Sequence, residues 1–454
     1  MRVRIKWKRI IILAVCASVS YFWAAAIRAG AHDGTRANDF VNMYYGTRCF
    51  LEHKDLYNPQ TVRAELKADG GRLPEMSAGE KAISGTWVMV QEYLPPAYLA
   101  MAPFGFLPRR VAQALWMVLI PLLMIVAGYL AWGLAPEAPV LAGCMAGFIL
   151  LNSVVVMTVG NPAGIVLPFC VIAAWCFLKE RYALAGVVLL AWSLAMKPHD
   201  AGLVWLYFVL AGGTGRKRAL QTLGITAVLG ICAALWIAPA SPHWVGELHG
   251  QIAMISAHGG ASDAGPTGLD NRGFSPIVSL QNTLAVFKDD AHFYNPVSYA
   301  IGGGLILAWM IAVLRKRRSR EETLLALAAI SILTMLPVYH HAEDAKLLLL
   351  AIPGCALLWA AGGARRWMAL GSTAAAIFVT SDIPIVAMVA ATGKVAISDS
   401  TIGGKVALLL VQPAPLVLLA AGCFYVCVLV RYRPAEARSG IDAAAVERAA
   451  GATA

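Results

Sequence analysis

The chain has 454 residues, of which 59% are hydrophobic and only 14% charged, and its formal net charge is +11. Soluble domains carry roughly 25% charged residues, so this composition excludes an ordinary soluble protein and indicates one whose solvent is largely hydrocarbon. The positive charge does not indicate nucleic-acid binding, because it is gathered in short clusters beside apolar runs, which is typical of cytoplasmic membrane anchors. The clusters lie at 2–9, 109–110, 216–218, 315–320, 365–366 and 431–433.

Thirteen apolar runs follow one another along the chain and predict an all-α polytopic membrane protein. Both termini are basic and are expected in the cytoplasm, so an odd number of crossings is excluded and at least one run does not cross. We therefore expect a bundle of about 12 transmembrane helices, some of them short and broken. The runs lie near 10–27, 93–107, 111–132, 140–158, 162–178, 182–196, 199–212, 218–238, 298–314, 323–339, 345–361, 367–390 and 405–430.

The first run, 10–27, has a basic start but no small-x-small cleavage site, so we expect it to be a retained span. A large polar loop, 28–90, follows and is predicted on the outer face. If the segment from Asn38 is helical, Asp39 and Asn42 share one face. A carboxylate beside aromatic residues at the membrane boundary is partly desolvated, which suits a general base. The alternative is that Asn38 or Asp39 simply caps a helix.

Polar interruptions of the next runs are further candidates. Glu92 and Tyr93 stand immediately before the run at 93–107. Gly160-Asn161 separates two later runs, and either faces the same polar cavity or forms an interfacial turn. Such breaks at membrane depth occur where the chain lines a cavity.

The shortest pair of runs, 182–196 and 199–212, is separated by Lys197. This pair is expected to form either one broken crossing or a re-entrant hairpin, since a full span needs about 20 residues. A lysine between apolar runs costs several kcal/mol unless it is paired or hydrated. Its predicted partner is a phosphate, or His199 and Asp200 beside it; the alternative is that it snorkels to the interface.

A second large outer loop is predicted at 240–296, where Arg272 could reach a phosphate bidentately. Residues 432–454 are expected to form a cytoplasmic tail, and 1–431 a single transmembrane domain. Between the runs ending near 339 and starting near 345, polar residues cluster around His340 and His341. They could present donors to a phosphate, bind a metal, or form a solvated turn. Adjacent histidines are poorly spaced for chelation on a helix, which makes a metal at this turn less favoured. No metal is expected in the protein, because the sequence lacks a clustered acidic motif.

Several of these segments, in order, resemble glycosyltransferase family 87 over about 10–360 of the chain. The chain departs from the pattern at His341, where a basic residue often follows the Tyr-His pair, and this leaves open which histidine is functional. The last two spans match by hydropathy only. The matching residues are Asn38-Asp39-Phe40, Tyr44-Tyr45, Leu56-Tyr57-Asn58-Pro59, Tyr93-Leu94-Pro95-Pro96, Pro103, Leu107-Pro108, Gly160-Asn161, Ala185-Gly186, Met196-Lys197-Pro198, and Pro337-Val338-Tyr339-His340-His341 with Asp344.

The resemblance implies a GT-C-type bundle and a polyprenyl-phosphate-linked sugar donor, commonly of mannose. It also implies inverting transfer to a lipid or glycan acceptor at the outer face of a bacterial cytoplasmic membrane, with no cofactor. Asp39 would be the catalytic base. The donor phosphate would be met by Lys197, His340, His341 and Arg272, and the substrates by Tyr44, Tyr45, Glu92, Tyr93, Asn161 and Asp344. A transporter or flippase of a lipid-linked or anionic solute is the alternative, because broken helices and buried charges also suit that class. A non-enzymatic assembly partner is a third.

Overall fold

Helices make up the regular structure of the described residues. The computed structural model describes residues 38–70, 89–257, 262–265, 277–315, 319–382 and 401–432, and also 17, 20, 21 and 24. Within these ranges the only β pairing is an isolated bridge between Ile277 and His341, so the expected all-α fold is confirmed. The run at 10–27 and the tail at 432–454 lie almost entirely outside the described residues.

The helices follow one another closely along the chain. The first half of the chain contributes α2 (Asn38–Leu51), α3 (Pro59–Ala68), α5 (Pro95–Gly105), α6 (Arg109–Gly133), α7 (Pro139–Leu151), α8 (Val154–Val159), α9 (Ala163–Leu178), α10 (Ala183–Met196), α11 (Pro198–Ala211) and α12 (Gly213–Ile237). The second half contributes α13 (Trp244–Ser256), α14 (Leu280–Ala285), α15 (Ala291–Arg315), α16 (Arg320–Leu333), the 3-10 helix η2 (Asp344–Leu350), α17 (Ala351–Ala361), α18 (Gly363–Val379), α20 (Ile402–Val411) and α21 (Ala414–Arg431).

Six stretches of helix in the described ranges are long and apolar enough to cross a membrane. They are Arg109–Gly133, Pro139–Val159, Gly213–Ile237, Ala291–Arg315, Asp344–Ala361 and Ala414–Arg431. A 25-residue helix spans about 37 Å, more than the roughly 30 Å of hydrocarbon. The protein is therefore a multi-pass membrane protein.

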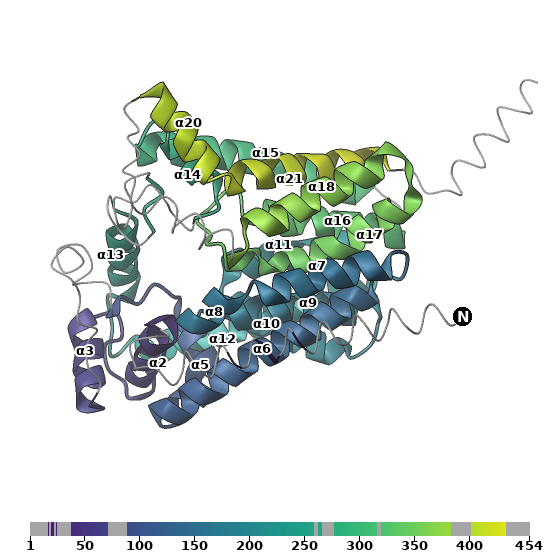
Figure 1. The fold of residues 1–454 in the computed structure, drawn as a ribbon. Coiled ribbons are helices and arrows are strands. Elements are labelled where there is room, and N and C mark those ends of the chain that lie inside the picture. Colours follow the sequence, from purple (N-terminus) through teal and green to yellow (C-terminus); the bar gives the residue numbers. More distant parts are fainter. Residues whose placement is uncertain are drawn as a thin grey trace, which may run out of the picture.

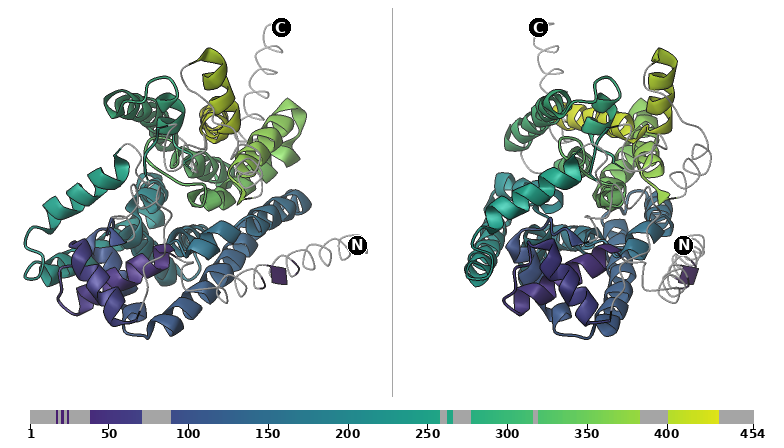
Figure 2. Two further views of the ribbon diagram at one scale, coloured as in Figure 1. Left: turned by 60° about the vertical axis from the view of Figure 1, so that its left-hand side comes forward. Right: turned by 90° about the vertical axis from the view of Figure 1, so that its left-hand side faces the viewer.

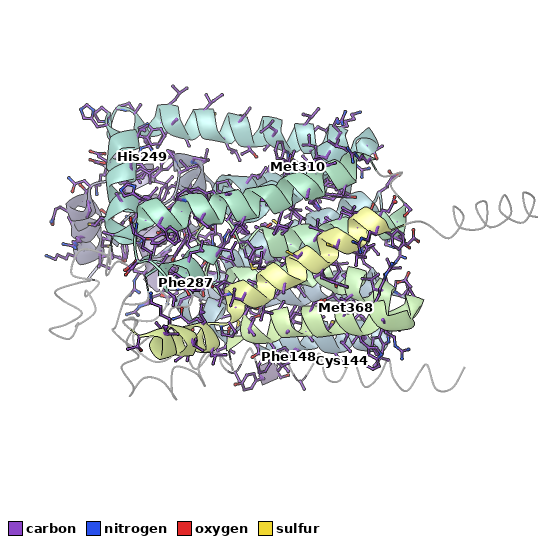
Figure 3. All side chains as sticks on the ribbon, turned by 90° about the horizontal axis from the view of Figure 1, so that it is seen from above. Cys144, Phe148, His249, Phe287, Met310 and Met368 are labelled. Carbon is purple, nitrogen blue, oxygen red and sulfur yellow. The ribbon has the colours of Figure 1, made fainter. Side chains whose placement is uncertain are left out.

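The long helices lie side by side, and α2, α3 and α13 gather at one end of them (Figure 1). The right-hand view of Figure 2 looks onto this end, with α2 and α3 in purple. Apolar side chains project from the outer faces of the helices, as at Met368 and Met310 (Figure 3). On α12 the large apolar residues Leu220, Val228, Ile231 and Leu235 are all more than half exposed, as a lipid-facing surface requires.

α10 and α12 run in the same direction. The Thr222 hydroxyl donates to the Val187 carbonyl (3.5 Å), and the Thr226 hydroxyl, one turn further along α12, donates to the Ala191 carbonyl (3.3 Å). Both helices therefore advance from the same end of the bundle.

α11 runs in the opposite direction to α12. Arg216, near the start of α12, donates to the Val209 carbonyl (2.9 Å), and the Trp205 indole donates to the Ala219 carbonyl (2.8 Å). Since α10 advances with α12 and α11 returns against it, the pair forms an antiparallel hairpin with Lys197 at its tip. This excludes one broken crossing, and the re-entrant arrangement stays a prediction.

Among the described residues, the end of the bundle where α10 begins and α11 ends carries basic residues from two clusters, and we call it the basic end. It includes 216–218 and Arg320, which donates to Glu137 and to the Leu134 carbonyl after α6. The Tyr207 hydroxyl on α11 donates to Thr323 on α16 at the same level (2.9 Å).

The cluster at 109–110 does not belong to the basic end, contrary to its expected role as a cytoplasmic anchor. Arg109 begins α6, whose other end meets Arg320, and its guanidinium lies 3.9 Å from Asp69 beyond α3. We call this opposite end the site end. The short α5 lies near the site end. The chain passes from Tyr93 to Leu107 without reaching the basic end, and the Leu107 carbonyl accepts a hydrogen bond from the Tyr44 hydroxyl on α2. Charge clustering alone therefore misassigned this pair.

Candidate active site

Five chain segments bring their polar side chains together at the site end. They are the start of α2, the segment 89–94 before α5, the turn between α8 and α9, the tip of the α10–α11 hairpin, and the segment 337–344 after α16. Each was a polar interruption between apolar runs in the sequence. Buried ionisable groups at such depth are costly and usually functional.

Asp39 is held by the turn between α8 and α9. The Asn161 side-chain amide donates to the Asp39 carboxylate (2.7 Å), while the Asn161 oxygen accepts from the Ala163 N–H (2.8 Å) and so fixes the orientation of the amide. Gly160 adopts the left-handed conformation (φ 67°) that turns the chain here, and its carbonyl accepts from the Trp116 indole (2.9 Å). Asn161, expected to bind substrate, is therefore bonded to the proposed base.

The environment of Asp39 disfavours its charged form. Burial, and then the Glu343 carboxylate, raise the pKa of Asp39 to about 7, with a smaller contribution from Glu92. The Asn161 hydrogen bond and the charge of His341 act in the opposite direction. A carboxyl whose pKa is near neutrality can both take and release a proton at physiological pH.

Lys197 is buried and bound to two carboxylates. Its ammonium lies 2.6 Å from Asp344 and 3.1 Å from Asp200. It therefore does not snorkel to the interface, and two protein carboxylates occupy two of its three N–H donors. Asp344, expected to bind substrate, is instead tied to Lys197 and accepts the backbone N–H of His341 (2.9 Å).

His340 is fully buried, with an oxygen close to each ring nitrogen. Nδ1 is hydrogen-bonded to the Val338 carbonyl (3.0 Å), and Nε2 lies 3.2 Å from the Asp200 carboxylate without hydrogen-bond geometry. Although burial lowers it, the pKa of His340 is raised by its interaction with Asp200. Lys197, His340, Asp200 and Asp344 thus form one buried cluster of ion pairs.

His341 lies on the Asp39 side of this cluster. Its ring nitrogens face the Tyr339 hydroxyl and the Glu343 carboxylate, the latter at 3.6 Å. Burial opposes protonation, but the hydrogen bond to Glu343 and its charge raise the pKa of His341. The backbone bridge to Ile277 and the hydrogen bond from the Val278 N–H to the His340 carbonyl (2.9 Å) hold this segment in place.

Glu92 and Tyr93 join the site from the segment before α5. Burial raises the pKa of Glu92. The charges of Lys197 and His341 lower this pKa, and the charge of Asp344 raises it. Gln91 fastens this segment: its amide donates to the Asn42 side chain (2.7 Å) and accepts from the Tyr98 hydroxyl (3.0 Å). Its backbone N–H donates to Gln251 on α13.

Because Gly46 on α2 has no side chain, the Gln91 side chain can occupy the space beside it. A Cβ at this position would lie 2.2 Å from the Gln91 side-chain oxygen and 2.8 Å from the Tyr98 ring. We expect Gly46→Ala to lower the free energy of unfolding by about 1–3 kcal/mol, because the added methyl overpacks this contact. Thermal unfolding of the detergent-solubilised protein measures the change. Gly147→Ala on α7 is the matched control, since nothing lies within 4 Å of its Cβ; equal stability of both variants would contradict the proposed role of Gly46.

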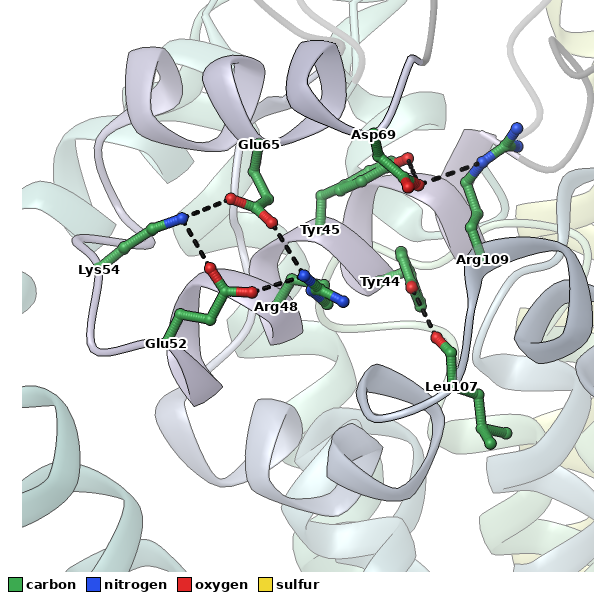
Figure 4. Close-up of polar contacts among 9 residues, drawn as sticks. All are labelled: Tyr44, Tyr45, Arg48, Glu52, Lys54, Glu65, Asp69, Leu107 and Arg109. Carbon is green, nitrogen blue, oxygen red and sulfur yellow. Dashed lines mark hydrogen bonds and ion pairs between the residues drawn. The ribbon is translucent and has the colours of Figure 1, made fainter.

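Tyr44 and Tyr45 are not part of this cluster. Both side chains project from α2 into the hydrophobic core, where their rings pack edge to face with centroids 5.1 Å apart. As Figure 4 shows, the Tyr44 hydroxyl donates to the Leu107 carbonyl (2.7 Å) and the Tyr45 hydroxyl to Asp69 (2.8 Å). Their hydroxyls are thus engaged in joining α2 to α3 and α6. Arg272 lies outside the described residues.

His199, Asp200 and His340 are close enough to consider as metal ligands, since their donor atoms lie within 4.8 Å of one another. The Lys197 ammonium, 3.1 Å from Asp200, places a positive charge beside any such ion. These residues therefore fit a metal poorly, and that no metal is needed stays a prediction.

Two residues of the site were underestimated from sequence. Asp200 was considered only as a partner of Lys197 and Glu343 was not singled out, yet Asp200 also lies 3.2 Å from His340 and Glu343 lies 3.6 Å from His341. Their signal was present in the polar runs at 197–200 and 339–346. What the sequence could not give was the pairing across the two runs.

A multi-span bundle with carboxylates, histidines and a lysine buried together at one end is typical of integral membrane enzymes. The chain belongs to glycosyltransferase family 87, whose sequence model matches residues 92–339. The resemblance seen in the motifs is thereby confirmed, and the protein is a membrane glycosyltransferase. The match includes Glu92, Asn161 and Lys197 but neither Asp39 nor His340. No curated protein matches the chain.

Proposed function

We propose that the protein transfers a sugar, with mannose the first candidate, from a polyprenyl-phosphate donor to a hydroxyl of a lipid or glycan acceptor, with inversion. The observation that carries this proposal is the placement of Asp39, whose pKa is raised to about 7, among the buried cations and carboxylates of the site end. The described residues are spans and short connecting helices, so a donor delivered within the membrane suits them better than a nucleotide sugar.

The reaction would be a single displacement. Asp39 takes the proton of the acceptor hydroxyl, and the oxygen forms a bond to the anomeric carbon. The bond between that carbon and the phosphate oxygen breaks, and its electron pair stays on the lipid phosphate. Fixed positive groups in a site of low dielectric stabilise the developing charge more than water would.

The cations expected to meet the phosphate contribute in different ways. Lys197 and His340 act through their field and by holding the hairpin tip, because they are buried and pair with Asp344 and Asp200. The charge of His341 lowers the pKa of Asp39, and we assign this histidine a direct contact with the donor. Arg272 remains in the proposal on sequence grounds alone.

The distribution of charge supports an outer location for the site. Basic clusters favour the cytoplasmic side of a membrane, and the basic end lies opposite Asp39 across the bundle. We therefore propose that the active site opens on the periplasmic or extracellular side of a bacterial cytoplasmic membrane.

The rate should depend on pH through Asp39. A raised pKa leaves the carboxyl protonated below about pH 7, and only the carboxylate can act as base, so kcat/KM should rise with pH and level off above the pKa. Asn161→Ala removes a hydrogen bond that lowers this pKa, and should move the acid limb to higher pH. Glu343→Gln removes a charge that raises it, and should move the limb to lower pH. Steady-state rates from pH 5 to 9 measure both; shifts in the same direction would contradict the assignment.

The direct test is incubation of the purified protein with radiolabelled polyprenyl-phosphate mannose and a membrane lipid extract. Label in a new lipid or glycan product supports transfer, and its anomeric configuration reports inversion. A transporter or flippase of the lipid-linked sugar would move label across a proteoliposome without changing its chemical form. That second outcome would replace the proposed function.

A further inference from the structure

His199 differs from every other charged or titratable side chain at the hairpin tip. It lies in the first turn of α11, and its side chain is exposed, whereas Lys197, Asp200 and His340 are buried. Among the described residues, no group forms a hydrogen bond or ion pair with its ring. Its only close ring contact there is with His340, at 5.2 Å between centroids and an interplanar angle of 66°.

The charged neighbours of His199 form ion pairs with one another. Lys197 is bound by Asp344 and Asp200, and His340 bridges Asp200 and the Val338 carbonyl. These neighbours are buried and paired with one another, whereas His199 is exposed. His199 is therefore the accessible imidazole at the tip, and the ion-pair cluster lies behind it.

We infer that His199 donates a hydrogen bond directly to the phosphate of the lipid-linked donor, beside the contact assigned to His341. The inference rests on the proposed function and deepens it. A neutral imidazole donates one N–H to a phosphate oxygen. As the bond to the anomeric carbon breaks, that oxygen gains negative charge and the hydrogen bond strengthens. The contact thus contributes more to the transition state than to the ground state.

The test compares His199→Ala and His199→Gln with His249→Gln. His249 lies exposed on α13, apart from the cluster, and controls for loss of an exposed imidazole (Figure 3). Hydrogen bonds to charged groups are worth about 1.5–3 kcal/mol, so His199→Ala should lower kcat/KM for the donor on the order of 10- to 100-fold. His199→Gln should recover part of the loss through its amide N–H, and His249→Gln should stay within about twofold of wild type.

A second readout needs no turnover. Binding of a short-chain prenyl phosphate, measured by its protection against thermal unfolding, should weaken in His199→Ala and not in His249→Gln. Unchanged binding and unchanged kcat/KM in His199→Ala would overturn the inference. Loss of wild-type activity in a chelator, with recovery on adding Zn²⁺, would also overturn it in favour of a metal held by His199, Asp200 and His340. Failure of wild type to use any polyprenyl-phosphate sugar, with prenyl phosphate still bound through His199, would reject the proposed reaction but not this site.

Discussion

Replacing Asp39 by Asn should abolish sugar transfer while leaving the fold intact. Asparagine keeps the size of the side chain and an oxygen that can accept from Asn161, but it cannot take a proton. Loss of a general base commonly costs on the order of 10²–10⁴ in rate, and the effect should appear in kcat rather than in KM for the donor. Radiolabelled transfer under saturating donor measures it.

The matched control for Asp39→Asn is Asp290→Asn, which removes a carboxylate paired with Lys288 at the surface. This control should transfer sugar at the wild-type rate. Prenyl phosphate binding should be equal in both variants and in wild type, because the proposed base does not hold the phosphate. Transfer by Asp39→Asn at more than about a tenth of the wild-type rate would rule out Asp39 as the base.

Replacing Lys197 by Met should destabilise the protein severely. The change leaves the buried carboxylates of Asp344 and Asp200 without their common cation. Breaking a buried ion pair by removing one partner typically costs about 3–5 kcal/mol, which is a large part of the stability of most domains. Thermal unfolding in detergent, together with the yield of monodisperse protein, measures the loss.

Two further variants separate buried charge from lost packing. Lys197→Met combined with Asp344→Asn removes one of the orphaned charges and should recover part of the stability. Lys288→Met at the surface should cost less than about 1 kcal/mol, because its ion pair with Asp290 is exposed to water. If Lys197→Met proved as stable as Lys288→Met, Lys197 would not be the cation that compensates the two buried carboxylates.

The sequence predicted well those features that depend on local composition. Long apolar runs predict spans because a helix in hydrocarbon must satisfy its own backbone and present apolar side chains. Polar interruptions such as Lys197 and the segment around His340 marked the site for the converse reason: a buried charge must be compensated. Asp39 was predicted from its place beside aromatic residues in the outer loop and from the order of the family motifs, and its role as base stays a prediction.

Features that depend on contacts across the bundle could not be predicted in this way. The clustering of Arg109 and Arg110 resembled an anchor at the basic end, but the direction of α6 places them beside α3. Tyr44 and Tyr45 looked like substrate contacts in a linear motif, and the packing of α2 instead directs both hydroxyls to structural partners. The local sequence is the same in either arrangement, so it does not decide between them.

By itself, then, the sequence determined that this protein crosses the membrane many times. It also determined which polar groups lie between the apolar runs, because both features depend on the free energy of placing each residue in hydrocarbon. The tertiary structure decided that α10 and α11 turn back at Lys197, and which carboxylates meet that lysine. Pairing between residues 147 positions apart, as for Lys197 and Asp344, is set by how helices pack, and no local pattern records it.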